Sequence, residues 1–262
     1  MNEAPLSYGT LGIAALLVVA NAALSLRLQL GVGRSLLIAG ARTAVQLLFV
    51  GLVLRTVFAL GSPWLVSAVL LAMLASAAWE TMSRQQRRFA GHWGYSVGAG
   101  TIAVATLPVT ALAIALLHPV PWYDPRFAVP MFGIILGNAM SGISVTLNSF
   151  NTAVVREQRA IEARLALGAT RDEALGGVRA AALRSGIIPV INQMSAAGII
   201  TLPGMMTGQV LAGMSPFDAA KYQIFVLFLL AGATGFGAAF AVLLATRRAT
   251  DARHRLRLDR FA

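Results

Sequence analysis

Side chains that could carry catalytic or metal chemistry are few and widely separated in this sequence. His92, His118 and His254 lie on different segments, and none has a second metal ligand at helical spacing. The chain has no Cys, no HExxH motif and no nucleophile-elbow signature. We interpret the histidines as interfacial or solvated residues, predict that the chain is not an enzyme, and leave any metal ligand unknown.

The sequence also has no GxxxxGK[ST] phosphate loop. In P-loop ATPases this loop binds the phosphates of the nucleotide. An ATP-driven cycle would therefore need another subunit to bind the nucleotide. We therefore expect no cofactor in this chain, with ATP and Mg²⁺ held by a partner subunit.

Charge is concentrated in one segment, from Arg156 to Arg184. The whole chain is 57% hydrophobic and only 12% charged, so this segment indicates a contact with a water-soluble partner. Val154, Ile161 and Leu165 recur at spacings of seven and four, which places a narrow apolar stripe on one face of a helix.

A turn divides the charged segment into two parts. Gly168 suits a helix C-terminus, because a positive φ costs little only for Gly. Thr170 is the predicted N-cap of a second helix, with Glu173 three residues later in the pattern of a capping box. The sequence predicts a helical hairpin over residues 151–185, which on spacing alone is equally compatible with a surface hairpin lying on the membrane interface.

The elements around this hairpin have the composition of membrane spans. The mean hydropathy is +0.73 and apolar runs of about 20 residues recur along the chain. The N-terminus lacks the basic region of a cleaved signal peptide, so the first run is expected to remain as a span. We predict an all-α polytopic membrane protein, a single transmembrane domain over 1–262, with a basic, partly disordered tail at 247–262. The seven predicted spans cover residues 7–26, 35–58, 64–83, 93–117, 128–150, 186–202 and 217–246.

The basic residues predict the orientation of these spans. All but four of the 21 Lys and Arg residues fall on one side; Arg55, Arg126 and Lys221 fall on the other, and Arg42 lies inside a span. Because cytoplasmic loops carry an excess of Lys and Arg, we predict an outside N-terminus and a cytoplasmic hairpin and C-terminus. This distribution explains the net charge of +11, and nucleic-acid binding is not predicted because no aromatic residues interleave with a basic face.

Two charged residues are predicted within the membrane. Arg42 lies in the second span and Glu80 near the cytoplasmic end of the third. Pairing between them would reduce the cost of burial, whereas snorkelling of Arg42 and interfacial solvation of Glu80 would explain them equally well.

A break in the sixth span suggests a path for a cation. Pro203 interrupts the helical pattern, and a broken helix is tolerated at membrane depth where it lines a cavity or is buried in protein. Met is also an ordinary packing residue, so a purely structural interpretation stays open. The candidate path comprises Asn138, Met140, Asn192, Gln193, Pro203, Met205 and Met206.

Three pairs of glycines have the GxxxG spacing that lets membrane helices approach closely. They are Gly94 with Gly98, Gly133 with Gly137, and Gly204 with Gly208. In a chain with 25 Gly such pairs also arise by chance.

Residues 162–168, EARLALG, resemble the EAA loop of ABC-transporter permeases, a Glu-Ala-Ala triplet followed by Gly. The resemblance implies that a short helix fits a groove on an ATPase subunit and carries ATP-driven motion into the membrane. The sequence departs from the importer pattern at residues 178–181, where VRAA replaces Ile-x-Leu-Pro, and this departure favours an exporter. The coupling residues assigned in this way are Glu157, Ile161, Glu162, Ala163, Leu165, Gly168, Ala169 and Thr170.

Four motifs in order resemble the FetB family of iron-export ABC permeases. They are IEARLALGAT, GNAM, LPGMMTG and AAKYQI, accompanied by Arg42 and Gln46 in an RxxxQ spacing. The resemblance implies a permease subunit in the inner or plasma membrane that works as a homodimer with a separate cytoplasmic ATPase and exports iron. The alternatives are an ABC permease for another metal or a small organic solute, and a secondary transporter or channel that needs no ATPase.

Overall fold

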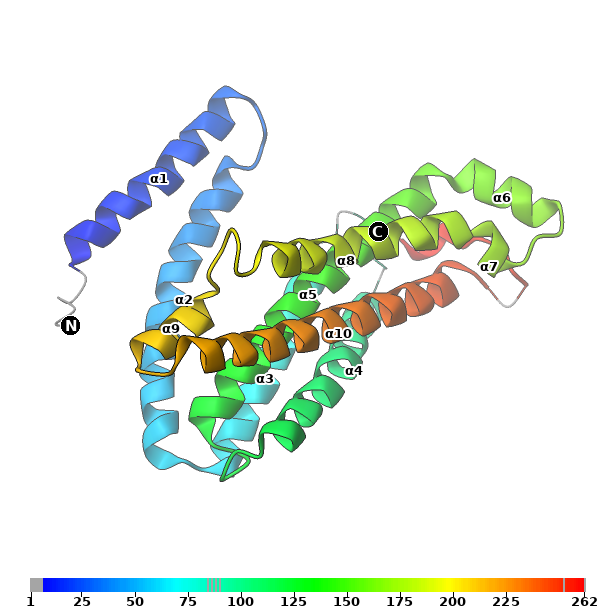
Figure 1. Ribbon diagram of the computed structural model, residues 1–262. Helices are drawn as coiled ribbons and strands as arrows, with labels where there is room; N and C mark the ends of the chain where they lie inside the picture. Colours follow the sequence, from blue (N-terminus) through cyan, green and yellow to red (C-terminus); the bar gives the residue numbers. More distant parts are fainter. Residues whose placement is uncertain are drawn as a thin grey trace. The chain divides into compact units, whose positions relative to one another are not determined.

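The computed structural model of the protein describes residues 7–83, 85, 87, 89, 91–251 and 253–261. Within these residues the chain forms ten α-helices and a 3-10 helix, and no strand (Figure 1). Arg84 and Arg88 of the predicted basic loop lie outside the described residues, as does the side chain of His92. The predicted all-α polytopic membrane fold is confirmed.

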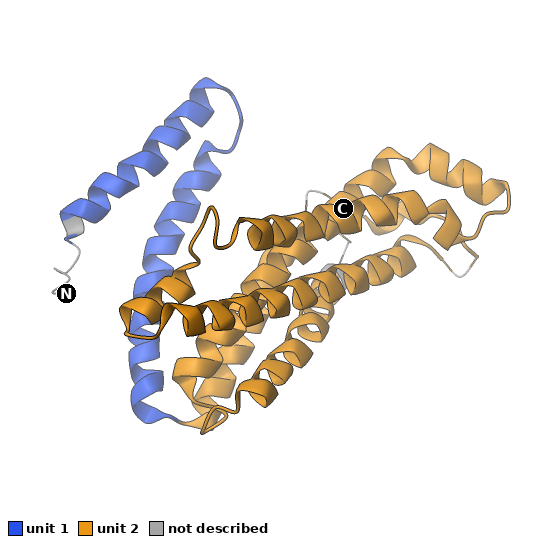
Figure 2. Ribbon diagram, viewed as in Figure 1, with its two compact units in different colours: residues 1–61 blue, residues 62–262 orange. Residues whose placement is uncertain are grey.

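The chain divides into two compact units, residues 1–61 and 62–262 (Figure 2). The first consists of α1 (Tyr8–Arg27) and α2 (Gly33–Leu60), which pack against each other. Ser7 caps α1 by accepting a hydrogen bond from the Thr10 N–H, and α2 ends where Gly61 adopts a φ of 54°. Most side chains of both helices are exposed and apolar, which suits a lipid environment.

The second unit is a bundle built around α5 (Pro125–Arg156). Four long helices pack along α5: α3 (Pro63–Ser83), α4 (His92–Leu117), α8 (Gly176–Ala196) and α10 (Pro216–Ala249). Pro at the first position starts both α5 and α10, and the preceding Asp124 and Ser215 cap the free N–H groups of Arg126 and Asp218. The buried side chains Phe132, Ile143 and Phe150 of α5 fill the centre of the bundle.

Glycines allow α5 to approach α8 and α10 closely. A Cβ on Gly186 of α8 would lie 2.7 Å from the Gly142 carbonyl oxygen of α5 and would also collide with Thr146. A Cβ on Gly237 of α10 would lie 2.7 Å from the Ile143 side chain. Of the predicted GxxxG pairs, Gly204/Gly208 has no such atom within 4 Å, whereas a Cβ on Gly133 would lie 3.0 Å from the Met73 side chain and one on Gly98 3.5 Å from the Ala78 carbonyl oxygen.

Six helices in the described part of the chain are long and apolar enough to cross a membrane: α1, α2, α3, α4, α5 and α10. The predicted sixth span, residues 186–202, is instead an interrupted element. Helix α8 begins at Gly176, inside the predicted hairpin, and ends at Ala196; residues 197–203 are not helical, and α9 follows at Gly204–Leu211. Polar residues of α8 such as Arg184, Asn192 and Gln193 explain why it is less apolar than the six.

We expect Gly186→Ala to destabilise the bundle, because the added methyl group would meet Thr146 and the Gly142 carbonyl and push α5 away from α8. Overpacking of this kind typically costs about 1–3 kcal/mol. The measurement is the melting temperature of the purified chain in detergent. Gly137→Ala, on α5 and with open space around its Cβ, is the control and should melt like the unmodified protein; equal melting of both variants would contradict the close contact.

Candidate functional site

The charged segment folds as the predicted helical hairpin. Helix α6 (Gln158–Ala166) continues from α5 after a kink at Glu157, which ends one helix and precedes the other. Gly168 then adopts a φ of 93°, and Thr170 caps α7 (Arg171–Ala174), a single turn that leads into α8 at Gly176. The hairpin is therefore a direct continuation of α5 and α8.

Hydrogen bonds fix the turn of the hairpin. Thr170 donates through its N–H and its hydroxyl to Glu173 Oε2, at 2.8 and 2.9 Å, and the Glu173 N–H donates back to Thr170 Oγ1 at 3.4 Å. The predicted capping box is thus present. The hydrogen bond from the Thr170 N–H, with that from its hydroxyl, lowers the pKa of Glu173 from its usual 4.5. These hydrogen bonds hold the carboxylate at the N-terminus of α7.

Two further contacts hold the hairpin together. Arg164 of α6 donates to the Ala174 carbonyl of α7 at 3.4 Å. Arg179 of α8 forms an ion pair with Asp172 of α7 at 2.6 Å. Because Arg179 is partly buried, this pair is less screened than a fully exposed one, and it links the short α7 to the longer helix behind it.

The two faces of α6 differ in exposure. Ile161 is buried and Leu165 packs against the core, in line with the predicted apolar stripe. Glu162, at the edge of this stripe, is exposed and accepts a hydrogen bond from Gln158 at 3.0 Å. Leu167, which the sequence did not single out, is 88% exposed at the tip of the hairpin.

The predicted coupling residues therefore fall into two groups. Ile161, Leu165 and the half-buried Ala169 are turned toward the bundle and anchor the hairpin. The exposed members can meet a partner; they are Glu157, Glu162, Ala163, Gly168 and Thr170.

The described residues of the tail contact the hairpin and other parts of the second unit, and the predicted partial disorder stays a prediction. The Arg171 N–H of α7 donates to His254 Nδ1 at 3.1 Å, and the Arg257 N–H donates to the Ala249 carbonyl at 2.8 Å. Phe261 lies 4.8 Å from Phe89, centroid to centroid. The tail folds back on α10, so that its N–H groups bind carbonyl groups at the end of that helix. Local sequence patterns do not predict this arrangement.

Ion pairs stabilise the tail itself. Arg257 binds Asp259 through two hydrogen bonds of 2.8 Å, which lower the pKa of Asp259 to about 2. Asp251 and Arg255 form a second pair at 2.8 Å. Arg253, His254 and neighbouring tail residues line, with Glu162 of α6, a pocket of about 460 Å³.

The residues of the predicted substrate path are distributed over three helices. Asn138 and Met140 of α5 are half-buried, and the Asn138 amide donates to the Ile134 carbonyl. Asn192 and Gln193 are exposed on α8. The predicted interruption is present, but it begins after Ala196 rather than at Pro203, with Gly198 at a φ of 81° and its N–H bound to Thr201.

Met205 and Met206 lie half-buried on α9 after Pro203, which precedes the helix as its N-cap. Met205 lines a cavity of about 300 Å³ with residues of α5, α9 and α10, among them Arg126, Gln209 and Tyr222. None of the other six predicted path residues lines this cavity.

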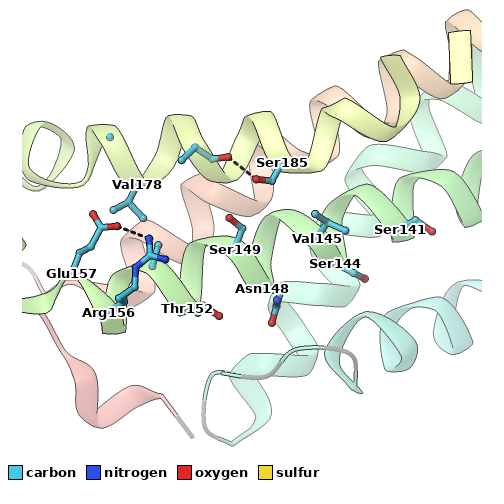
Figure 3. Close-up of a pocket in the computed structure, with 13 residues that line it drawn as sticks. Ser141, Ser144, Val145, Asn148, Ser149, Thr152, Arg156, Glu157, Val178 and Ser185 are labelled. Atoms are coloured by element: carbon cyan, nitrogen blue, oxygen red, sulfur yellow. Dashed lines mark hydrogen bonds and ion pairs between the residues drawn. The ribbon is translucent and has the colours of Figure 1, made fainter. Parts of the chain in front are cut away.

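A polar groove that the sequence did not indicate lies between α5 and α8. It has a volume of about 580 Å³, and the Arg156–Glu157 ion pair, at 2.8 Å, marks one end (Figure 3). Helix α8 contributes mainly small residues to the opposite wall. The polar lining residues are Ser141, Ser144, Asn148, Ser149, Thr152 and Ser185.

The remaining ionisable candidates do not form a site among the described residues. His118 ends α4 in a left-handed conformation, and His254 belongs to the tail. No group of three His, Cys, Asp or Glu side chains that could hold a metal occurs in the part of the chain described. Arg42 and Glu80 belong to different units, so their pairing stays a prediction.

Comparison with known proteins relates the chain to a family of membrane proteins. The family described as "Uncharacterised protein family (UPF0014)" matches residues 8–250. A UPF0014 membrane protein of Synechocystis is 40% identical over 198 residues, 74% of this chain and 75% of that protein. The probable iron export permease protein FetB of Escherichia coli is 30% identical over 260 residues, 98% of this chain and 97% of that protein. The UPF0014 membrane protein STAR2 of rice is 35% identical over 225 residues, 85% of this chain and 76% of that protein. No solved structure matches.

We expect Thr170→Ala to loosen the turn of the hairpin, because it removes the hydroxyl that accepts from the Glu173 N–H. Loss of such a cap costs about 1 kcal/mol, which should appear as faster hydrogen exchange of the amides at 171–175. Thr170→Ser keeps the hydroxyl and should exchange like the unmodified chain. If the Ala and Ser variants exchange alike, the capping box does not stabilise this turn.

Proposed function

The chain belongs to the UPF0014 family of membrane proteins, and we propose that it is the membrane-spanning subunit of an ATP-binding-cassette transporter that exports iron or a related metal. The relative from Escherichia coli, similar over nearly the whole chain, is named a probable iron export permease. The six apolar helices, each long enough to cross a membrane, agree with a permease.

The observation that carries the proposal is the form of the α6–α7 hairpin. Ile161 and Leu165 anchor α6 to the bundle, so the helix is held firmly while Glu162 and Leu167 stay exposed. A partner bound to the exposed face would push or pull on α5 and α8, because the hairpin is continuous with both. This is the property that an ATPase-coupling element needs.

The energy source in this proposal is a separate cytoplasmic ATPase, which binds ATP and Mg²⁺. The chain has no phosphate loop of its own. Each chain offers one such hairpin and an ABC assembly uses two, so the proposed transporter is a homodimer of this chain with two ATPase subunits. It lies in the cytoplasmic membrane with the hairpin and the C-terminus inside, as the distribution of Arg residues favours.

The test is to look for an ATPase gene beside the gene of this chain, to purify the two products together, and to measure both co-elution and transport. We expect stoichiometric co-elution and ATP-dependent accumulation of iron in inverted vesicles. Iron transport that needs no ATPase would make the chain a secondary transporter or channel. ATP-dependent movement of a non-metal alone would reject iron as the cargo.

Glu162→Lys should uncouple the permease from its ATPase while leaving the folded chain in the membrane. Glu162 is exposed on α6 beside the tail residues Arg253 and Arg255, so reversing its charge changes this surface and not the core. We expect at least about a tenfold loss of ATP-dependent transport. The neutral Glu162→Gln variant separates loss of charge from reversal of charge, and unchanged ATPase binding by the Lys variant would place the docking face elsewhere.

Leu167→Ala should weaken ATPase binding by about tenfold without lowering the melting temperature of the chain. The reason is that its side chain is 88% exposed and contributes little to the bundle. Leu165→Ala is the matched control: it removes a side chain packed against the core and should lower the melting temperature. If Leu167→Ala melts like Leu165→Ala, Leu167 packs inside the protein rather than against a partner.

A further inference from the structure

The polar side chains of the groove form a continuous stripe along α5. Ser141, Ser144, Asn148 and Thr152 are separated by three or four residues, which places them on one face of the helix. From Ser141 to Arg156 the stripe is about 22 Å long at 1.5 Å per residue. That length is most of the roughly 30 Å thickness of a bilayer's hydrocarbon core.

Two buried hydroxyls of the stripe have no hydrogen-bond partner in the part of the chain that the structure describes. Ser144 is only 6% exposed, yet its hydroxyl has no hydrogen-bond partner among the described residues, and the same holds for the Thr152 hydroxyl. Within α8, Ser185 lines the groove but bonds to the Ala181 carbonyl of its own helix. Buried hydroxyls without a hydrogen-bond partner favour a site that a polar ligand or water enters.

A second groove in the same bundle shows the contrast. It lies between α4 and α10, has about 510 Å³, and is lined by apolar side chains such as Leu112, Phe236 and Leu243. Such a surface suits lipid chains, which offer no hydrogen bonds. The groove between α5 and α8 has a similar volume but carries hydroxyl and amide groups, so its chemistry and not its size sets it apart.

The groove offers neutral oxygen ligands and almost no charge. Its one carboxylate, on Glu157, is held by Arg156 at 2.8 Å at the end of the groove. Tight binding of a dehydrated transition metal uses carboxylate, imidazole or thiolate ligands, and the described lining has no cluster of these. Hydroxyl and amide groups can instead hydrogen-bond to the waters around a cation. A shell of about six waters needs about 180 Å³, which the groove can hold.

We propose that the groove between α5 and α8 is the cytoplasmic part of the transport path, and that it takes a divalent metal cation together with its hydration shell. This proposal rests on the proposed function as a metal exporter. The neutral lining binds the hydrated cation weakly, so the cation can leave the groove again. The path so defined differs from the residues around Met205, which line a separate cavity.

The test of the groove uses the absence of Cys from the chain, so that a single introduced thiol is the only one labelled. Ser149→Cys places it in the polar groove, and Ala239→Cys places it in the apolar groove as a matched control. In membrane vesicles, a quaternary-ammonium thiol reagent should label the first at least about ten times faster, because thiolates form in water and not in lipid. Equal rates would overturn the groove as an aqueous path.

The test of the cargo adds a carboxylate. In inverted vesicles with the ATPase partner, Ser149→Asp should lower both the half-saturating Fe²⁺ concentration and the maximal ATP-dependent rate, each by about tenfold, because a carboxylate coordinates the cation directly. Ser149→Asn introduces a neutral side chain similar in size to Asp and should change neither the half-saturating Fe²⁺ concentration nor the maximal rate. Identical behaviour of the Asp and Asn variants would overturn the hydrated cation as cargo.

The two parts of the test can fail separately. If the unmodified transporter moves no iron while the introduced thiol of the Ser149→Cys variant is still labelled rapidly, the proposed function and the cargo are overturned and the aqueous groove stands. If iron moves but labelling is slow, the function stands and this path is overturned.

Discussion

The close contact between α5 and α8 at Gly142 and Gly186 is the constraint on which the rest of the second unit depends. Neither position has room for a methyl group, because each Cβ would meet backbone or side-chain atoms of its neighbours. The two helices are antiparallel, and both extend from this contact to the hairpin. The polar groove lies along them, between the contact and the hairpin. The hairpin joins the two helices at the other end. A displacement of the hairpin therefore acts on a pair of helices that is fixed at the glycine contact, and the groove between them is the part free to change width.

Anchoring and exposure on α6 have complementary roles in such a mechanism. A coupling element that did not pack against the bundle would bend when a partner moved it. One that was fully buried would offer the partner no surface to bind. Ile161 and Leu165 supply the attachment, and the capping box and the Asp172–Arg179 pair keep the turn from opening. The tail adds a second support, because His254 accepts the Arg171 N–H at the start of α7. In the proposed mechanism, these packed and hydrogen-bonded groups would pass on motion applied at Glu162 or Leu167.

Local chemistry was predictable from the sequence, whereas contacts between distant helices were not. Gly168 and the Thr170–Glu173 capping box depend only on residues a few positions apart, and both are present as predicted. The contacts of the tail were not predicted because they join residues far apart in the sequence, such as Phe89 and Phe261. The path residues assigned from the sequence were chosen for side-chain chemistry, without knowledge of which helix faces meet.

The polar groove was the principal omission, although a signal for it was present. Ser141, Asn148 and Thr152 recur at helical spacing inside an apolar segment, but such small polar residues also bond to their own helix backbone, as Ser141 does to the Gly137 carbonyl. What distinguishes the groove is the opposing wall of α8, where Gly177 and Ala181 leave space that larger side chains would fill. A site of this kind is defined as much by small residues on one helix as by polar residues on the other, and only the packing of the two reveals it.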